Sequence, residues 1–474
     1  MALETDLAFH DLHRHAATEA KMLTVNFNSI GEGAAIVRYT LGGIGVAPAR
    51  AQEDEVARVA RMQVEAKDAQ FLREAATAIG VTDRFRDVIQ TFNTPPGETP
   101  AGFRVEASLV TDGLLLIDLV RDISYDRNGQ RRPTGVVFSA DTANPYEVAP
   151  IAPLLGNLTC NPGIVYDLFI NDPKANVGHK FNTLEEVMTE LSHILGPGCD
   201  VSVEIEDPFE PDFNRILDAI APFEQILSPY RLVVKVPHAG PVNGQNVGQL
   251  LSGDKRLDAW YAAPPTEDAF RSHNLALKLR EHGYRVNYTL MFEPYQTALA
   301  LQAKPYFINS FIRHRLFQTE RIARLLEAYQ STRDKVHLVA LRDFLLSTDH
   351  LSADCPIQDL VDVLHYAEDL VAYRKYEKPE GRDGLDSVRH NLRLLKQAHL
   401  PDTRLIICSM EGPRNYPDID ELLVEPEFAD VIDRIVVTAE PHYLARFTSA
   451  SLVVSYQRRF MAAAATAAIP VSLP

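Results

Sequence analysis

The sequence predicts an α/β protein whose main part is an eight-stranded (β/α)8 TIM barrel, preceded by a smaller region that is mainly helical or α+β. From residue 133 onward, short β-rich runs alternate with helical segments, which is typical of parallel βα units. Eight β-rich runs can be marked, and eight strands close such a barrel. The chain has 474 residues and is 46% apolar, so it can form a large buried core and one further region.

Residues 1–132 are predicted to form an N-terminal extension, to which the sequence assigns no chemistry. Residues 51–79 are helix formers with apolar side chains near helical spacing, so we expect one long amphipathic helix there, ended by a proline-rich turn. Residues 103–110 and 114–123 are expected to form two strands, or a strand and a short helix. The polar segment 127–133 marks the boundary with the barrel.

The barrel is predicted to occupy residues 133–474. Its strands are expected at 135–141, 156–161, 200–205, 232–237, 284–289, 306–311, 405–409 and 434–438. Apolar stripes at helical spacing predict helices at 184–195, 213–220, 267–281, 294–303 and 388–398. The insertion at 313–403 exceeds one crossover helix and must hold several helices, which would cover the active face or build an oligomer contact.

Charge and hydropathy exclude several classes of protein. The formal net charge of −17 disfavours a nucleic acid or an anionic membrane as the main partner, because phosphate would be repelled. The sequence contains no apolar run long enough to span a bilayer. Its first residues lack the basic and apolar regions of a secretory signal, so we expect a cytoplasmic protein.

The cysteines and the N-terminal histidines predict no metal site. The four cysteines are dispersed without a Cys-x-x-Cys motif, which indicates neither a disulfide framework nor structural zinc. His10, His13 and His15 stand at loosely helical spacing near a terminus, where solvated histidines are more common than metal ligands. The cysteines are Cys160, Cys199, Cys355 and Cys408.

Polar residues gather at the carboxyl ends of the predicted strands, where the reactive groups of such barrels lie. Asn287 and Thr289 alternate on the fifth strand and therefore share one face of it. The other candidates at strand ends are Asp141, Asn161, Glu204 and Lys235.

Lys235 interrupts the apolar run that forms the fourth strand. Burial of an ammonium is costly, and we expect desolvation to lower its pKa toward the range in which a neutral amine attacks a carbonyl. A lysine that forms a Schiff base requires such an amine. The alternative is a structural lysine paired with Glu204 or Asp141, which is the commoner situation for a lone strand lysine.

Six segments of the sequence, taken in order along the chain, carry a resemblance to a known family. They are DTANPYEVAPIAPLLGNLTCNPGIV, VSVEI, LVVKVP, YRVNYTLMFEPYQTALALQAKPYFINSFIRHR, IICSMEGPRNYPDI and IVVTAEPHYLARF. Together they resemble the transaldolases, class I Schiff-base enzymes on a (β/α)8 barrel, and the related fructose-6-phosphate aldolases. The resemblance covers residues 136–445.

This resemblance implies a catalytic set of four residues. Lys235 would attack a ketose carbonyl and form an iminium, whose nitrogen withdraws electrons from the breaking carbon–carbon bond. Asp141 would take the proton from the hydroxyl beside that bond and return it on resynthesis. Glu204 and Thr289 would hold the water that carries protons during iminium formation and hydrolysis. The resemblance implies no organic cofactor and no metal.

The resemblance also implies substrate-binding residues. Asn161 and Asn287 would hydrogen-bond the hydroxyls of a bound dihydroxyacetone unit. Asn309 stands where the family usually has Ser in the motif I-S-P-F-V-G-R, and Phe311 stands at the family's Phe. Without the resemblance, Asn161 before Pro162 is equally compatible with a turn, and Asn287 with a satisfied polar group of the core.

The chain departs from the family where a phosphate would be bound. The phosphate-binding arginine of the family falls on His314, with Arg313 and Arg315 beside it, and Arg414 is the equivalent of the second one. Glu293 adds a negative charge on the active side of the barrel. An anionic sugar phosphate would depend on the basic cluster of these arginines, and the departures suggest an unphosphorylated substrate or one whose phosphate is held elsewhere.

The sequence therefore predicts a transferase that moves a dihydroxyacetone unit between a ketose and an aldehyde. One alternative is a lyase that releases dihydroxyacetone. Another is a catalytically silent barrel that acts as a binding module, with residues 1–132 as its interaction part. The expected partners are sugars or sugar phosphates, without nucleic acid or membrane, and a homo-oligomer is compatible with the sequence.

Overall fold

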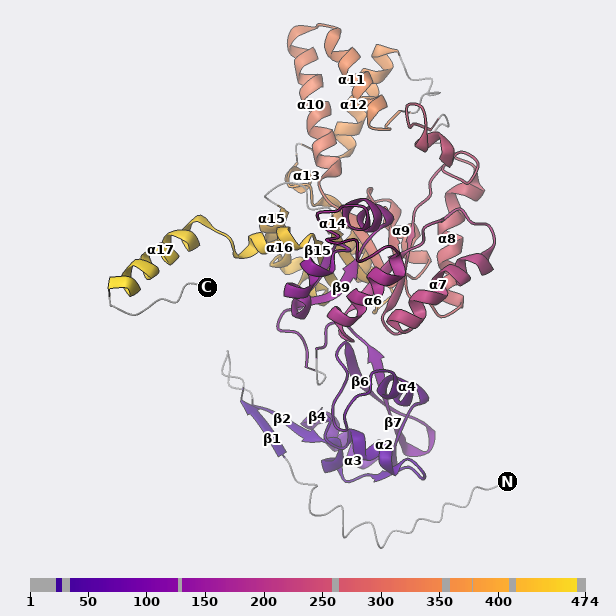
Figure 1. The fold of residues 1–474 in the computed structure, drawn as a ribbon, viewed down its shortest axis with the longest axis vertical. Coiled ribbons are helices and arrows are strands. Elements are labelled where there is room, and N and C mark those ends of the chain that lie inside the picture. Colours follow the sequence, from indigo (N-terminus) through magenta and orange to yellow (C-terminus); the bar gives the residue numbers. More distant parts are fainter. Residues whose placement is uncertain are drawn as a thin grey trace. The chain divides into compact units, whose positions relative to one another are not determined.

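The computed structural model describes residues 23–27, 35–126, 130–257, 264–351, 359–376, 378–408 and 415–466. The chain divides into two compact units, Met1–Pro133 and Thr134–Pro474. The division falls beside the boundary that the polar segment 127–133 predicts. Figure 1 shows the helices and strands of both units.

The N-terminal unit, expected to be mainly helical or α+β, is a mixed α/β structure with two small sheets. One sheet has the strand order β1-β2-β4 and is antiparallel. The other has the order β3-β5-β7-β6; its last pair is antiparallel and occupies the two segments in which the sequence predicts strands, or a strand and a short helix. The strands are β1 (Leu23–Phe27), β2 (Ala35–Thr40), β3 (Ala47–Pro48), β4 (Gln63–Glu65), β5 (Ala78–Val81), β6 (Phe103–Leu109) and β7 (Leu114–Arg121). The helices are α2 (Glu53–Val59), α3 (Ala66–Ala75) and α4 (Asp83–Thr91).

The single long helix predicted over residues 51–79 is wrong. The segment forms α2, β4, α3 and the start of β5 instead. The backbone of β4 pairs with the edge of β2, and Leu41 donates a backbone hydrogen bond to the carbonyl of Met62. These pairings with distant parts of the chain outweigh the helix propensity of the residues, which is a weak preference of less than about 1 kcal/mol per residue.

The second unit contains a closed barrel of eight parallel strands in the order β8-β9-β10-β11-β12-β13-β14-β15. This confirms the predicted fold class, and each expected strand is present within two residues of its expected bounds. The strands are β8 (Val137–Asp141), β9 (Leu155–Thr159), β10 (Asp200–Glu204), β11 (Leu232–Pro237), β12 (Val286–Thr289), β13 (Phe307–Phe311), β14 (Arg404–Cys408) and β15 (Ile435–Ala439).

Helices follow the strands and pack on the outside of the barrel. In α6, the side chains of Val187, Met188 and Leu191 are fully buried at helical spacing, and each stabilises the fold by about 2 kcal/mol. Thr183 caps this helix by accepting a hydrogen bond from the backbone of Glu186. These helices are α5 (Pro145–Val148), α6 (Leu184–Leu195), α7 (Phe213–Leu227), α8 (Thr266–Glu281), α9 (Gln296–Gln302), α14 (Asp386–Gln397), α15 (Asn415–Leu423) and α16 (Pro441–Ala445). The last helix, α17 (Ser451–Thr466), is exposed along nearly its whole length.

The insertion between β13 and β14 holds several helices, as predicted. Helices α10, α11 and α12 lie side by side (Figure 1) and enclose a core of their own, in which Ile322, Leu341 and Val363 are fully buried. A small hydrophobic cluster separate from the main core is common in a long insertion of this kind. The helices of the insertion before α14 are α10 (His314–Thr332), α11 (Val336–Ser347), α12 (Leu360–Tyr373) and α13 (Pro379–Arg382).

A buried ion network joins the insertion to the loop after β12. Glu293 forms an ion pair with Arg315 at 2.9 Å and accepts a hydrogen bond of 2.8 Å from Arg374, and Arg315 also contacts Asp386 at the start of α14. Both arginines are only 7% exposed. The sequence presented Glu293 as an added negative charge, but two guanidinium groups compensate it, as burial of a charge requires.

In the part of the chain that the structure describes, no helix combines the length and the apolar character needed to cross a bilayer.

The two faces of the barrel strands differ in chemistry. Val203, Val234 and Tyr288 point outward and belong to the core that the strands share with the helices. Because successive side chains of a strand alternate in direction, Glu204 and Lys235 point into the barrel. The fold therefore places a set of polar side chains in the interior of the closed barrel.

Candidate active site

The interior of the barrel is lined by polar side chains from neighbouring strands. Lys235 is 6% exposed and Thr289 is 1% exposed, so these groups are largely withdrawn from water. The polar side chains at interior positions are Ser139, Asp141, Asn157, Thr159, Ser202, Glu204, Lys235, Asn287, Thr289, Asn309 and Thr438. The structure therefore brings together the four catalytic residues that the sequence predicts.

Lys235 and Glu204 form an ion pair inside the barrel. The register of the parallel strands sets Glu204 of β10 beside Lys235 of β11. The Lys235 Nζ lies 2.9 Å from Glu204 Oε2, and it also donates a hydrogen bond of 3.4 Å to the backbone carbonyl of Cys160, which follows β9. Three consecutive elements thus fix the position of the amine.

The expected lowering of the Lys235 pKa is wrong. Burial alone does lower the pKa of this amine, but the negative charges of Glu204 and Asp141 raise it, and the net result is a pKa above the usual value. The sequence indicated the burial, but it did not show how close the carboxylates lie. Lys235 therefore rests as an ammonium and must lose a proton before it can act as a nucleophile.

Asp141 carries a strongly perturbed carboxyl group at the end of β8. Burial raises the pKa of Asp141 to about 6, although the ammonium of Lys235 opposes this shift, and Glu440 and Glu204 reinforce it. A carboxyl group that titrates near neutral pH can both accept and donate a proton under physiological conditions. Such a pKa suits the acid–base role that the sequence predicts for Asp141.

A chain of amide and hydroxyl groups crosses the barrel beside Lys235. Asn287 donates to Ser202 Oγ at 3.1 Å, and its Oδ1 accepts a short hydrogen bond from Asn309. Asn309 also donates to the carbonyl of Tyr288 at 3.0 Å. Both amides are thus held in fixed orientations, which is the condition for recognising a substrate hydroxyl.

Thr289 differs from these amides because its hydroxyl has no partner. Among the described residues, no protein group hydrogen-bonds the buried Oγ1 of Thr289. An unsatisfied polar atom costs stability unless something else binds it. The hydroxyl is therefore available to a water molecule or a substrate in the barrel.

Asn161 lies outside the strand that the sequence assigned to it. The strand β9 ends at Thr159, and Asn161 Oδ1 accepts a hydrogen bond of 2.9 Å from the backbone of Ile164. This contact is the turn that the sequence offered as the alternative for Asn161. The substrate-binding role of Asn161 stays a prediction.

Of the arginines predicted to bind a phosphate, two are held in ion pairs and the third lies outside the described residues. Arg313 is buried and forms an ion pair with Asp418, and Arg315 belongs to the network around Glu293. The basic cluster expected from Arg313 and Arg315 is therefore already neutralised by carboxylates. Arg414 lies outside the described residues, as do Cys355 and the three N-terminal histidines.

Phe311 and His314 form an aromatic group with Phe292. The rings of Phe311 and Phe292 lie 4.5 Å apart, and the ring of His314 meets that of Phe292 edge-on at 5.4 Å. Phe292 follows β12, and the other two residues end β13 and begin α10. The group therefore stands at the carboxyl ends of adjacent strands, at the mouth of the barrel.

Sequence reasoning missed Glu440 and Phe292. Glu440 directly follows β15, and its charge contributes to the raised pKa of Asp141. Both residues come after the carboxyl end of a strand, so the rule that found Asp141 and Lys235 also covers them. Both residues lie within the six ordered segments, but the resemblance assigned neither of them a role.

The described residues contain no group of three or more His, Cys, Asp or Glu side chains arranged to hold a metal ion. Cys160, Cys199 and Cys408 are buried free thiols.

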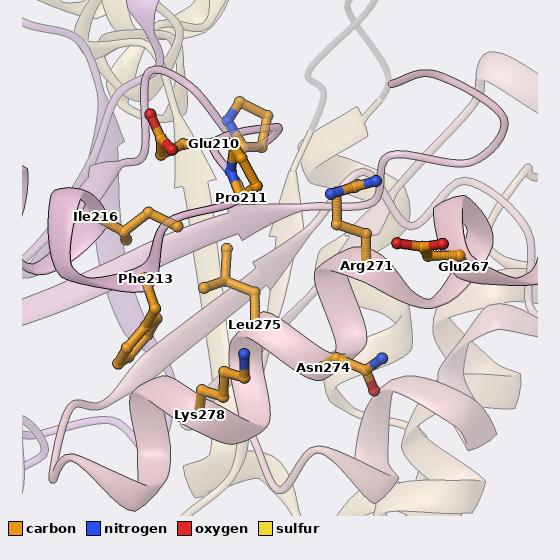
Figure 2. A pocket seen from close by; sticks show the side chains of 10 residues that line it. Glu210, Pro211, Phe213, Ile216, Glu267, Arg271, Asn274, Leu275 and Lys278 are labelled. Carbon is orange, nitrogen blue, oxygen red and sulfur yellow. The ribbon is translucent and has the colours of Figure 1, made fainter. Parts of the chain in front are cut away.

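Two surface hollows lie between helices on the outer side of the barrel. One of about 200 Å³ lies between the start of α7 and helix α8, where Phe213, Leu275 and Lys278 face one another (Figure 2). Another of about 590 Å³ lies between α6, α7, β10 and β11, and Glu204 is among the residues that line it. The other catalytic candidates do not line these two hollows and converge in the barrel interior, so the candidate site is placed there.

The sequence matches no protein-family model, and no curated protein matches it either.

Two substitutions separate structural from functional polar groups in the barrel. We expect Asn287→Ala to lower the free energy of unfolding by about 1–3 kcal/mol, because Ser202 and Asn309 lose a partner. Thr289→Val keeps the shape and breaks no hydrogen bond within the protein, so thermal unfolding should change little. Calorimetry on both variants would contradict this assignment if Thr289→Val proved as destabilising as Asn287→Ala.

Proposed function

We propose that the chain is a Schiff-base enzyme of the transaldolase type, which moves a three-carbon ketol unit from a ketose to an aldehyde. The observation that carries the proposal is the amine of Lys235, buried in the barrel 2.9 Å from Glu204 and electrostatically coupled to Asp141. A lysine in this setting has a proton acceptor within reach and is shielded from bulk water. The resemblance of the six ordered segments supports the same chemistry.

The reaction begins with transfer of a proton from the Lys235 ammonium to Glu204. The neutral amine adds to the ketose carbonyl and gives a carbinolamine. Glu204 and Thr289 hold the water that carries protons while the carbinolamine loses its hydroxyl as water and becomes an iminium. The unpartnered hydroxyl of Thr289 supports this role, because it can bind that water without breaking another contact.

Cleavage follows from the positive charge on the iminium nitrogen. Asp141 takes the proton of the hydroxyl beside the breaking bond, an aldehyde forms there, and the bonding electrons pass to the nitrogen to leave an enamine. An acceptor aldehyde then bonds to the enamine carbon, and its oxygen takes the proton back from Asp141. Hydrolysis of the new iminium releases the product and restores Lys235.

Asn287 and Asn309 position the three-carbon unit beside Lys235. Their amides are oriented by Ser202 and by the carbonyl of Tyr288, so they present fixed polar atoms to the hydroxyls of the ketol. The strand register sets Asn287 directly beside Lys235. Asn161 is proposed as a further contact from the neighbouring β9 loop.

Borohydride trapping tests the proposal. We expect incubation with dihydroxyacetone and sodium borohydride to give a stable adduct, which peptide mass spectrometry places on Lys235. Lys235→Met should give no adduct, whereas Lys278→Met, which removes a lysine of α8 outside the barrel interior, should behave as the wild type. If dihydroxyacetone, fructose, fructose 6-phosphate and sedoheptulose 7-phosphate all fail to mark Lys235, the Schiff-base function is wrong and a silent barrel is favoured.

A second measurement distinguishes transfer of the ketol unit to an aldehyde from its release as dihydroxyacetone. A trapped enzyme that passes its ketol unit to an added aldehyde is a transferase. One that liberates dihydroxyacetone from a ketose at the same rate with or without acceptor is the lyase alternative.

The pH dependence of kcat/KM for cleavage reports the two perturbed groups. We expect the rate to fall as the pH is lowered through about 6, because Asp141 must be ionised to accept a proton. The rate should keep rising through the alkaline range in which an ordinary lysine titrates, because the carboxylates raise the pKa of Lys235. Glu204→Gln removes the nearest carboxylate, so the alkaline limb should move to lower pH while the rate falls about 10²–10⁴-fold.

The control for this profile is Glu206→Gln, which alters a carboxylate that hydrogen-bonds Tyr166 at 2.6 Å instead of Lys235. It should leave the alkaline limb in place. An unmoved limb in Glu204→Gln would show that Glu204 does not set the pKa of Lys235.

A further inference from the structure

Three aromatic side chains form a wall at the mouth of the barrel. This aromatic wall consists of Phe292, Phe311 and His314, whose rings contact one another at centroid distances of 4.5, 5.4 and 6.3 Å. Each of the three residues is half-buried, so part of each remains accessible. Phe311 ends β13 on the same strand face as Asn309, which places it above the amide chain beside Lys235.

The wall is held in place by the loop after β12. Gln296 Oε1 accepts hydrogen bonds of 2.8 Å from the backbone N–H groups of both Phe292 and Glu293. The carboxylate of Glu293 is in turn fixed by Arg315 and Arg374. The ring of Phe292 therefore stands on a rigid support, and a group that binds against it loses little free energy in ordering the protein.

The charges around the wall disfavour a phosphate. Arg313 and Arg315, the cations nearest to it in sequence, are engaged by Asp418 and by Glu293 with Asp386. Within the described residues, the carboxylates of Asp141 and Glu204 lie near the ammonium of Lys235 in the barrel interior, and Glu440 is close enough to raise the pKa of Asp141. A doubly charged phosphate would have to leave water and approach these carboxylates.

We infer that the aromatic wall is the subsite for the far end of the acceptor aldehyde and that it selects an uncharged, carbon-rich group over a phosphate. The faces of Phe292 and Phe311 bind apolar groups and stack on other rings, and these two rings offer no compensation for an anion. This inference rests on the proposed function, since it names the acceptor class of the same site.

The test compares acceptors on enzyme supplied with dihydroxyacetone. We expect kcat/KM for phenylacetaldehyde to exceed that for glyceraldehyde 3-phosphate by about tenfold or more. Phe292→Ala should lower kcat/KM for phenylacetaldehyde about tenfold while that for glyceraldehyde changes less than about threefold, as expected for loss of one aromatic contact. Phe317→Ala removes an exposed ring from the same helix as His314 and should leave the acceptor preference unchanged.

Two results would overturn the inference. One is a wild-type preference for glyceraldehyde 3-phosphate that Arg414→Ala abolishes, which would establish a phosphate clamp. The other is an equal loss with both aldehydes in Phe292→Ala, which would assign the ring a structural role.

Trapping with dihydroxyacetone alone separates this inference from the proposed function. That reaction involves Lys235 and no acceptor, so Phe292→Ala should still give the adduct, which also shows that the variant is folded. If no adduct forms in the wild type, the proposed function fails. If the adduct forms but the acceptor order is reversed, only the role of the aromatic wall fails.

Discussion

The ion pair between Lys235 and Glu204 is the interaction on which the barrel interior depends. An isolated ammonium in this closed space would pay a desolvation cost of several kcal/mol, and so would an isolated carboxylate. The register of β10 and β11 offsets these costs in part, because it sets the two opposite charges side by side at 2.9 Å. The same pairing raises the pKa of Lys235, so it holds the amine protonated until a substrate alters its surroundings. The proton on Lys235 therefore stabilises the ion pair, and its removal makes the amine reactive.

Other residues of the candidate site lie on β12, the strand beside Lys235, and in the loop that follows it. Asn287, next to Lys235 in the register, orients Asn309 and is oriented by Ser202. Thr289, two residues further along β12, leaves its hydroxyl open to a ligand. The loop beyond it carries Glu293, which the arginines of the insertion hold. One strand thus connects the reactive interior, the aromatic mouth and the base of the helical insertion.

Much of the barrel could be predicted from the sequence, because alternation of β-rich runs and helical stripes is a local property. The pairing of Lys235 with Glu204 was offered only as the structural alternative, with Asp141 as the other candidate partner; both carboxylates stand with Lys235 at the carboxyl ends of parallel strands. The direction of the Lys235 pKa did not follow, because it depends on the distances to two carboxylates. The engagement of Arg313 by Asp418 depends on residues that are far apart in the chain, and so does the pairing of β4 with β2 that divides the expected helix over 51–79. The pattern of residues within a short segment of sequence does not indicate contacts between residues that are far apart in the chain.

The central claim is that Lys235 is the group that becomes covalently attached to the ketose. A crystal structure of the protein soaked with dihydroxyacetone tests it most directly. The account predicts continuous electron density between Lys235 Nζ and the carbonyl carbon of the ligand, with the ion pair to Glu204 broken and the ligand hydroxyls near Asn287. Dihydroxyacetone bound at another place, with the ion pair between Lys235 and Glu204 intact, would contradict the account.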